Sequence, residues 1–170
     1  MRLGRCYWIT GIPASGKTTL ARAWVSALQQ SNVPTVFLDG DELRQGLCSD
    51  LGLSDADRSE NIRRAGEVAS LIVHGGLTVV CAFVSPFMKD RQRVRDLFSP
   101  GEFSEIYLNT PLQECVRRDP KNLYARAKAG QVTGLTGWDA PYEAPACPEF
   151  SFDTSTTTTQ QMVKKLTAAR

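Results

Sequence analysis

Short apolar runs alternate along this chain with longer segments in which apolar residues recur every three or four positions. The run at 77–84 is apolar almost without alternation, which is typical of a strand covered on both faces in a parallel sheet. We therefore expect this strand to lie centrally in its sheet. Runs of the same kind predict further strands at residues 5–10, 33–38 and 105–108.

Amphipathic helices are predicted between and after these strands. The helix at 55–73 has start and stop signals of its own, because Ser54 and Asp57 form a capping pair and a Gly-Gly pair follows its end. A threonine run at 156–159 is predicted to cap a last helix that continues to Arg170. The other predicted helices are at 17–30, at 89–98 and from Pro111 onward. Strands that alternate with helices predict an α/β layered fold with right-handed crossovers.

Composition and charge narrow the classes of protein that fit. The 170 residues fit one globular domain, 1–170, and the contents of 42% apolar and 22% charged residues are ordinary for a folded protein. A formal charge of +2 gives no sign of a general affinity for nucleic acid or anionic lipid. No apolar run reaches the length of a membrane span, and the first residues do not resemble a signal peptide. Five scattered cysteines and one histidine have no metal-site spacing, so we expect reduced thiols and a cytoplasmic location.

A glycine-rich turn joins the first predicted strand to the first predicted helix. Residues 11–18 match G-x-x-x-x-G-K-[ST], and a strand before and a helix after are the context that this motif requires. In such a loop the backbone N–H groups surround phosphate oxygens, Lys17 reaches the outer phosphates and the Thr18 hydroxyl ligates Mg²⁺. We therefore expect ATP and Mg²⁺ as cofactors, and a three-layer P-loop NTPase fold in which helices flank a parallel β-sheet. The residues predicted to bind the nucleotide are Gly11, Ile12, Pro13, Ala14, Ser15, Gly16, Lys17, Thr18 and Thr19.

Acidic residues after the second predicted strand favour a kinase over a switch GTPase or a motor ATPase. A guanine-reading Asn-Lys-x-Asp is absent, and the most apolar strand lacks the terminal Asp of Walker-B ATPases. Asp39 and Asp41 stand instead at the end of a strand, where a carboxylate could take or orient the proton of an acceptor hydroxyl. The same Asp-Gly-Asp sequence would also suit a simple turn. Arg44 follows it, and Arg58 and Asn61 share a helix face that could point at an anionic acceptor.

A long polar stretch at 119–148 is the remaining feature of the chain. Connections of this length in compact domains are usually functional lids or disordered, and this one mixes cations with glycines. We predict a basic lid at about 119–148, with Lys121 and Arg126 inside it and Arg118 at its entrance.

Taken together, these residues resemble the adenylylsulfate kinase family over most of the chain, from Ile9 to about Thr154. The segments that carry the resemblance are far more specific than the glycine-rich loop alone. They are residues 11–19, 38–41, 57–64, 83–86, 118–121, 123–124, 136–137 and 141–145.

The resemblance implies transfer of the ATP γ-phosphate to the 3′-hydroxyl of adenylyl sulfate, which gives 3′-phosphoadenylyl sulfate for sulfate assimilation. It implies that Asp41 is the catalytic acid, that the lid closes over the phosphates, and that the chain can form a homodimer. The residues it implies for acceptor binding are Asp39, Arg44, Leu53, Arg58, Asn61, Val84, Ser85, Lys121 and Leu135. Lys17 and Ser85 are implied as further catalytic residues, and a serine at this position is often described as a phosphoserine intermediate. Because in-line transfer needs no covalent relay, Ser85 would equally suit the turn before Pro86.

Departures from the family pattern concern the identity of the acceptor. Leu53 and Leu135 stand where family members commonly carry the two phenylalanines that sandwich adenine, and Met88 stands where an arginine is usual. Stacking on an aromatic ring contributes about 1 to 3 kcal/mol per base. A relative that phosphorylates another nucleotide conjugate, such as a cytidine diphosphate derivative, is therefore the close alternative. A protein that binds ATP without transferring phosphate is the alternative of another class.

Overall fold

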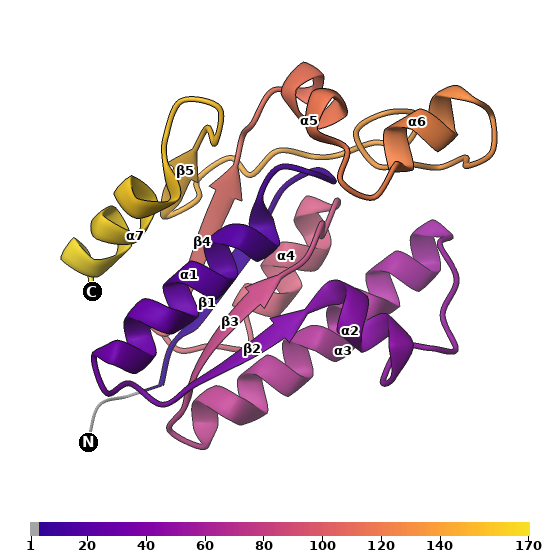
Figure 1. The fold of residues 1–170 in the computed structure, drawn as a ribbon. Coiled ribbons are helices and arrows are strands. Elements are labelled where there is room, and N and C mark those ends of the chain that lie inside the picture. The colour runs from indigo at the N-terminus through magenta and orange to yellow at the C-terminus, as the bar shows by residue number, and fades with distance from the viewer. Residues whose placement is uncertain (1–3) are drawn as a thin grey trace.

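Residues 4–170 are described by a computed structural model of the chain, in which five parallel strands form one sheet in the order β2-β3-β1-β4-β5 (Figure 1). The strands are β1 (Cys6–Thr10), β2 (Thr35–Asp39), β3 (Thr78–Ala82), β4 (Phe103–Leu108) and β5 (Phe150–Phe152). The helices are α1 (Lys17–Gln30), α2 (Gly40–Gln45), α3 (Asp55–His74), α4 (Met88–Arg95), α5 (Leu112–Arg118), α6 (Leu123–Lys128) and α7 (Thr159–Ala168). The single-domain prediction begins at residue 1, and residues 1–3 lie outside the described part.

Helices cover both faces of the sheet, which makes three layers. Successive side chains of a strand point to opposite faces, so Tyr7 and Ile9 pack with α1 and α7 while Cys6 and Trp8 pack with α3 and α4. All five residues of β1 and all five of β3 are buried, as the continuous apolar runs predict. The predicted α/β architecture is therefore confirmed, although β1 and not β3 is the middle strand.

The strands and helices predicted from periodicity are all present, with ends that differ by a few residues. The predicted cap of α3 is confirmed, because Ser54 Oγ accepts a hydrogen bond of 3.1 Å from Asp57 N–H. The threonine run also caps its helix, since Thr158 and Gln161 form a capping box at the start of α7.

Three short elements were not predicted: α2, α6 and β5. α2 buries no side chain and α6 buries only Tyr124, so neither has the apolar stripe that marks a helix in a sequence. β5 has three residues, which is too short for a periodic signal. The stretch predicted as a lid is thus partly helical, because α6 lies within it.

The carboxyl ends of the strands meet at one edge of the sheet, and α5 and α6 lie beyond that edge, beside the turn between β1 and α1 (Figure 1). Ligands of open α/β sheets bind outside this edge. Among residues 4–170, no helix combines the length and the apolar character needed to cross a membrane.

Candidate active site

A cavity of about 730 Å³ opens at this edge, between the glycine-rich turn, the end of β2, the start of α3 and the lid. The predicted residues that line it are Pro13, Ala14, Gly16, Lys17, Thr18, Thr19, Asp39, Asp41, Arg44, Leu53, Arg58, Asn61, Val84, Ser85, Arg118, Lys121 and Leu135. The predicted residues outside its lining are Gly11, Ile12, Ser15 and Arg126. Positions that are far apart in the sequence thus share one cavity.

The glycine-rich turn runs from the end of β1 to the start of α1, whose amino terminus faces the cavity. Gly16 has a φ of 99°, in the left-handed region that favours glycine, and it directly precedes the helix. A Cβ added to Gly11 would lie 2.8 Å from Ser15 Oγ and 2.9 Å from the Leu108 carbonyl oxygen. Both glycines are therefore needed to shape the turn, and free N–H groups at the helix start suit an anion.

Lys17 lies along the inside of this turn. Its Nζ donates a hydrogen bond of 2.7 Å to the Ile12 carbonyl oxygen. Burial of the ammonium group lowers the pKa of Lys17 from 10.5 to about 8. The loop thus holds a cation that gains a strong partner only when an anion enters.

Thr18 and Asp39 bring two oxygen ligands together across the gap between α1 and β2. Thr18 Oγ1 donates a hydrogen bond of 3.1 Å to Asp39 Oδ2, and Asp39 Oδ1 accepts one of 2.9 Å from Asp41 N–H at the start of α2. Asp39 is buried, and each of its two carboxylate oxygens accepts one of these hydrogen bonds. Hydroxyl and carboxylate oxygens are the ligands that Mg²⁺ prefers, and it usually takes few of them from the protein. Residues 4–170 contain no group of three or more His, Cys, Asp or Glu side chains that could hold a metal ion.

Asp41 faces the lid from the start of α2. Its carboxylate forms an ion pair with Lys121, and the two side chains are 62% and 59% exposed, respectively. An exposed pair of this kind contributes little to stability. It does place a lid cation and a carboxylate at the same point on the cavity wall.

Arg58, on α3, forms hydrogen bonds to two segments of the cavity wall. Its Nε donates to the Leu53 carbonyl oxygen at 2.8 Å, and its terminal nitrogens donate to Thr136 Oγ1 and to the Gly134 carbonyl oxygen in the lid. The guanidinium thus joins the Leu53 segment to the Leu135 segment. Thr136 was not among the predicted site residues, although it lies in segment 136–137, which carries part of the family resemblance.

Other acceptor-side residues differ in how fully their polar groups are satisfied. Arg44 donates a hydrogen bond of 2.9 Å to the Gly52 carbonyl oxygen. Asn61 is buried, and its Oδ1 has no protein partner although it lies on the cavity wall. A buried polar atom without a partner is unfavourable unless a ligand or water satisfies it. Leu53 is 61% exposed and Leu135 only 8%.

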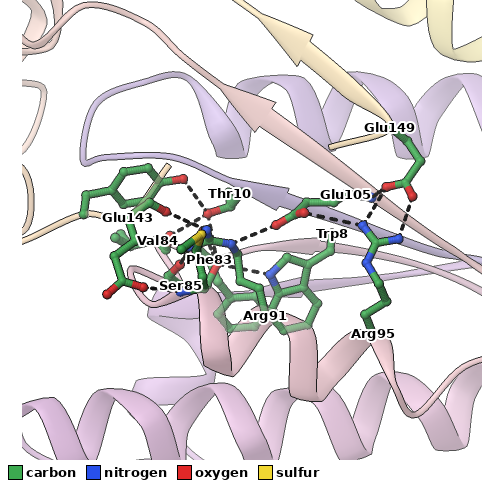
Figure 2. Close-up of polar contacts among 12 residues, drawn as sticks. Trp8, Thr10, Phe83, Val84, Ser85, Arg91, Arg95, Glu105, Glu143 and Glu149 are labelled. Atoms are coloured by element: carbon green, nitrogen blue, oxygen red, sulfur yellow. Dashed lines mark hydrogen bonds and ion pairs between the residues drawn. The ribbon is translucent and has the colours of Figure 1, made fainter. Parts of the chain in front are cut away.

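Ser85 is oriented toward the protein interior and is 1% exposed. Its Oγ accepts a hydrogen bond of 3.1 Å from Trp8 Nε1 and donates one of 3.1 Å to Thr10 Oγ1 (Figure 2). Its φ of 40° is left-handed, which costs about 1 to 3 kcal/mol in a residue other than glycine. The hydroxyl contacts therefore support the turn-holding role of this serine.

The lid packs directly on the glycine-rich turn. Tyr124 is buried, and its hydroxyl donates a hydrogen bond of 2.9 Å to the Pro13 carbonyl oxygen. Arg118, at the lid entrance, donates to Thr154 Oγ1 at 2.7 Å. Arg126 is exposed and lies outside the cavity lining. The lid is thus in contact with the turn that would bind phosphates, and Lys121 is its cation on the cavity side.

Comparisons with known proteins agree with this geometry. The profile of the family described as adenylylsulphate kinase matches residues 3–153. The chain is 52% identical over 161 residues to an adenylyl-sulfate kinase of Marinobacter nauticus, covering 95% of this chain and 81% of the relative. It is 55% identical over 147 residues to one of Geotalea uraniireducens, covering 86% and 71%.

This chain belongs to the adenylylsulphate kinase family. A solved structure of the Mycobacterium tuberculosis APS kinase CysC in complex with AMPPNP and APS superposes with a TM-score of 0.94, at 37% identity, covering 99% of this chain and 98% of the other. The resemblance seen in the sequence is thereby confirmed, and so is the predicted P-loop NTPase fold.

We expect the lowered pKa of Lys17 to make nucleotide binding dependent on pH. A triphosphate bound beside Lys17 would stabilise the ammonium form and so raise the pKa of Lys17 above its free value of about 8. Affinity for ATP is then complete below the free value and decreases as pH rises through the bound value. We expect proton uptake on ATP binding at about pH 9 and almost none at about pH 7.

Isothermal titration calorimetry in two buffers of different ionisation enthalpy measures this uptake. Lys17→Arg is the control, because a guanidinium stays protonated throughout this range. Equal binding heats in the two buffers at the higher pH would contradict the expectation.

Proposed function

We propose that this chain transfers the γ-phosphate of ATP to the 3′-hydroxyl of adenylyl sulfate, giving ADP and 3′-phosphoadenylyl sulfate. The observation that carries the proposal is the single cavity in which a glycine-rich turn and Lys17 face Asp41 and the acceptor-side residues Arg58 and Asn61. It lies in a chain that matches 81% and 75% of the length of two adenylyl-sulfate kinase relatives and is about half identical to them.

ATP is assigned to the glycine-rich side of the cavity. The amino terminus of α1 and the backbone N–H groups of the turn would contact the β- and γ-phosphates, and Lys17 would neutralise the outer phosphates. Mg²⁺ would be held by the Thr18 hydroxyl, with Asp39 beside it, and when bound it would neutralise charge on the phosphate oxygens. The hydrogen bond from Thr18 supports a role for Asp39 at the metal, beside the acceptor-binding role that the resemblance implies for it.

Asp41 is assigned the proton of the acceptor hydroxyl. In-line transfer needs that hydroxyl beside the γ-phosphate and a carboxylate within hydrogen-bond distance of its proton. Lys121 now pairs with Asp41. Phosphate oxygens offer this lysine a partner of greater charge, so entry of ATP would free the carboxylate and bring the lid cation to the transferring group.

The acceptor is assigned to the space between α3 and the lid. Asn61 offers an unsatisfied carbonyl oxygen to a donor such as an amino group on a base, while Arg44 and Arg58 supply positive charge for the phosphosulfate. The inward hydrogen bonds of Ser85 support a role in shaping this wall rather than a phosphoserine intermediate.

The direct test is product formation with a panel of acceptors. We expect ADP release with adenylyl sulfate at micromolar concentration and one phosphorylated product for each ADP. Turnover of a cytidine diphosphate conjugate without turnover of adenylyl sulfate would support the alternative acceptor. ATP binding without ADP release on any acceptor would indicate a non-catalytic ATP-binding protein.

The two leucines in the cavity predict a measurable loss of base stacking. We expect Leu53→Phe combined with Leu135→Phe to lower the KM for adenylyl sulfate at least about fivefold, because one aromatic stack contributes about 1 to 3 kcal/mol. The measurement is the initial rate against acceptor concentration at saturating ATP. Leu47→Phe is the matched control, since Leu47 is 48% exposed and outside the cavity lining. An unchanged KM in the double variant would show that these leucines do not contact the base.

Self-association is proposed as well. A related structure, described as a hexameric APS kinase from Thiobacillus denitrificans, has a TM-score of 0.74 and 31% identity to this chain, covering 98% of this chain and 28% of the other. We propose a dimer or a larger assembly, which light scattering after gel filtration would measure. The cytoplasmic location stays a prediction from the sequence.

A further inference from the structure

A network of polar groups lies behind the acceptor wall, on the α4 side of the sheet, and most of its residues are buried although Glu143 is exposed (Figure 2). We call it the Arg91 network. It consists of Trp8, Thr10, Ser85, Arg91, Glu105, Tyr142 and Glu143.

Arg91, on α4, is the centre of this network and is only 3% exposed. Its Nε lies 2.8 Å from Glu105 Oε1 on β4, an ion pair that lacks the alignment of a hydrogen bond. One terminal nitrogen donates to the Ser85 carbonyl oxygen and the other to the Glu143 carbonyl oxygen, both at 2.6 Å. The guanidinium thus connects three segments that are distant in the sequence.

Thr10 is the second junction of the network. Its hydroxyl donates to the Val84 carbonyl oxygen at 2.7 Å, accepts from Ser85 Oγ at 3.1 Å and lies 2.9 Å from the Tyr142 hydroxyl. The Tyr142 ring lies 5.6 Å from the Arg91 guanidinium carbon. Both junctions therefore connect the residues after β3 to residues 142–143.

The segments that this network connects must keep fixed positions relative to one another for phosphoryl transfer. Thr10 is the last residue of β1 and directly precedes the glycine-rich turn. Val84 and Ser85 line the acceptor side of the cavity. Residues 142–143 lie near the end of the lid, where the chain returns to the sheet. Arg91, Glu105, Tyr142 and Glu143 are all outside the cavity lining, so they can act only through the segments that they hold.

Burial makes this arrangement specific to arginine. A buried ion pair is often no more stabilising than a well-packed apolar pair. We therefore expect the Arg91–Glu105 pair to act mainly by fixing the positions of the segments around it. The planar guanidinium has donors in fixed directions and reaches its three partners at once. A lysine keeps the charge beside Glu105, but a single ammonium cannot hold both carbonyl oxygens in the same directions.

We propose that Arg91 is a positioning residue for phosphoryl transfer. It fixes the Ser85 turn and lid residues 142–143 relative to the glycine-rich turn. The inference rests on the proposed function. If the relative positions of these segments change, the acceptor hydroxyl no longer lies in line with the γ-phosphate, and water can replace it as the nucleophile. Transfer then decreases while hydrolysis of ATP to ADP and inorganic phosphate increases.

The ratio of inorganic phosphate to phosphorylated acceptor, with both substrates saturating, tests this proposal. In Arg91→Lys we expect this ratio to rise at least about fivefold and kcat for transfer to decrease about 10- to 100-fold, since a displacement of about 1 Å costs on the order of 100-fold. The KM for ATP should stay within about twofold, because the phosphate-binding turn keeps its own contacts. The ratio does not depend on the folded fraction of the sample, so a merely structural role for Arg91 would leave it unchanged.

Two further variants complete the test. Arg95→Lys is the matched control one turn along α4. Arg95 pairs with Glu149 at 2.6 Å and also contacts Glu105 at 3.4 Å, but it has no hydrogen bond to the Ser85 turn or to residues 142–143. Its ratio should equal that of the wild type. Tyr142→Phe removes only a hydroxyl, so it decides the matter if Arg91→Lys does not fold, and its ratio should rise at least about twofold.

Each outcome is decisive. An unchanged ratio in Arg91→Lys, or in Tyr142→Phe where the first variant is insoluble, overturns the inference and leaves the proposed function intact. An equal rise in Arg95→Lys also overturns it, since the effect would then belong to α4 as a whole. A wild-type enzyme that forms no product from adenylyl sulfate overturns the proposed function, and this inference with it.

Discussion

Lys17→Ala is expected to lower kcat for phosphoryl transfer at least about a thousandfold, because electrostatic stabilisation of the transferring group is usually the largest single contribution to such catalysis. The lysine is the cation of the glycine-rich turn, and its ammonium donates to the Ile12 carbonyl oxygen. The rate of ADP formation at saturating substrates measures the loss.

The fold should survive this substitution. Burial lowers the pKa of Lys17, which means that the folded protein disfavours its charged form, so removal of the side chain should leave the melting temperature equal or higher. Lys164→Ala is the control, since Lys164 is exposed on α7 and outside the cavity. A Lys17→Ala enzyme that keeps kcat within about tenfold of the wild type would contradict the role given to Lys17.

Asp41→Asn is expected to lower kcat about 100- to 1,000-fold while the affinity for ATP changes little, because general-base help contributes about 100- to 10,000-fold. The amide keeps the shape of the side chain but cannot accept the proton of the hydroxyl. The ion pair with Lys121 is lost as well, and since both partners are more than half exposed the melting temperature should change little. Single-turnover rates and ATP titrations separate the two effects.

Asp50→Asn is the matched control for this variant. Asp50 is 59% exposed, close to the 62% of Asp41, and it likewise pairs with a cation, at 2.6 Å from Arg64, but it lies outside the cavity. A similar loss of rate in both variants would assign the effect to surface charge. An unchanged kcat in Asp41→Asn would show that Asp41 is not the base for the acceptor proton.

The glycine-rich turn and its place between a strand and a helix could be predicted from the sequence because their signals are local. Strand, glycine-rich turn and helix follow one another in residues 6–30, and each element has the composition that its backbone requires. The acids after β2 could be predicted for the same reason, since a parallel strand delivers its next residues to the carboxyl edge of the sheet.

Contacts between distant segments could not be predicted in this way. Arg58 shares a helix face with Asn61, which predicted that both point at an anionic acceptor. The hydrogen bonds of its guanidinium to lid residues 76 and 78 positions away had no signal in the sequence. Ser85 has a turn sequence around it, but its inward direction depends on Trp8 and Thr10, more than 70 positions earlier. Arg91 has no motif at all, because its role follows only from what the fold packs around it.

We propose that Asp41 orients the 3′-hydroxyl of adenylyl sulfate beside the γ-phosphate of ATP. A crystal structure of the wild-type protein with a non-hydrolysable ATP analogue, Mg²⁺ and adenylyl sulfate would show whether it does. We predict an acceptor 3′-oxygen about 2.6 to 3.2 Å from an Asp41 carboxylate oxygen and about 3 to 3.5 Å from the γ-phosphorus, with Lys121 on phosphate. A 3′-oxygen on the far side of the cavity from Asp41, with that carboxylate still paired to Lys121, would contradict it.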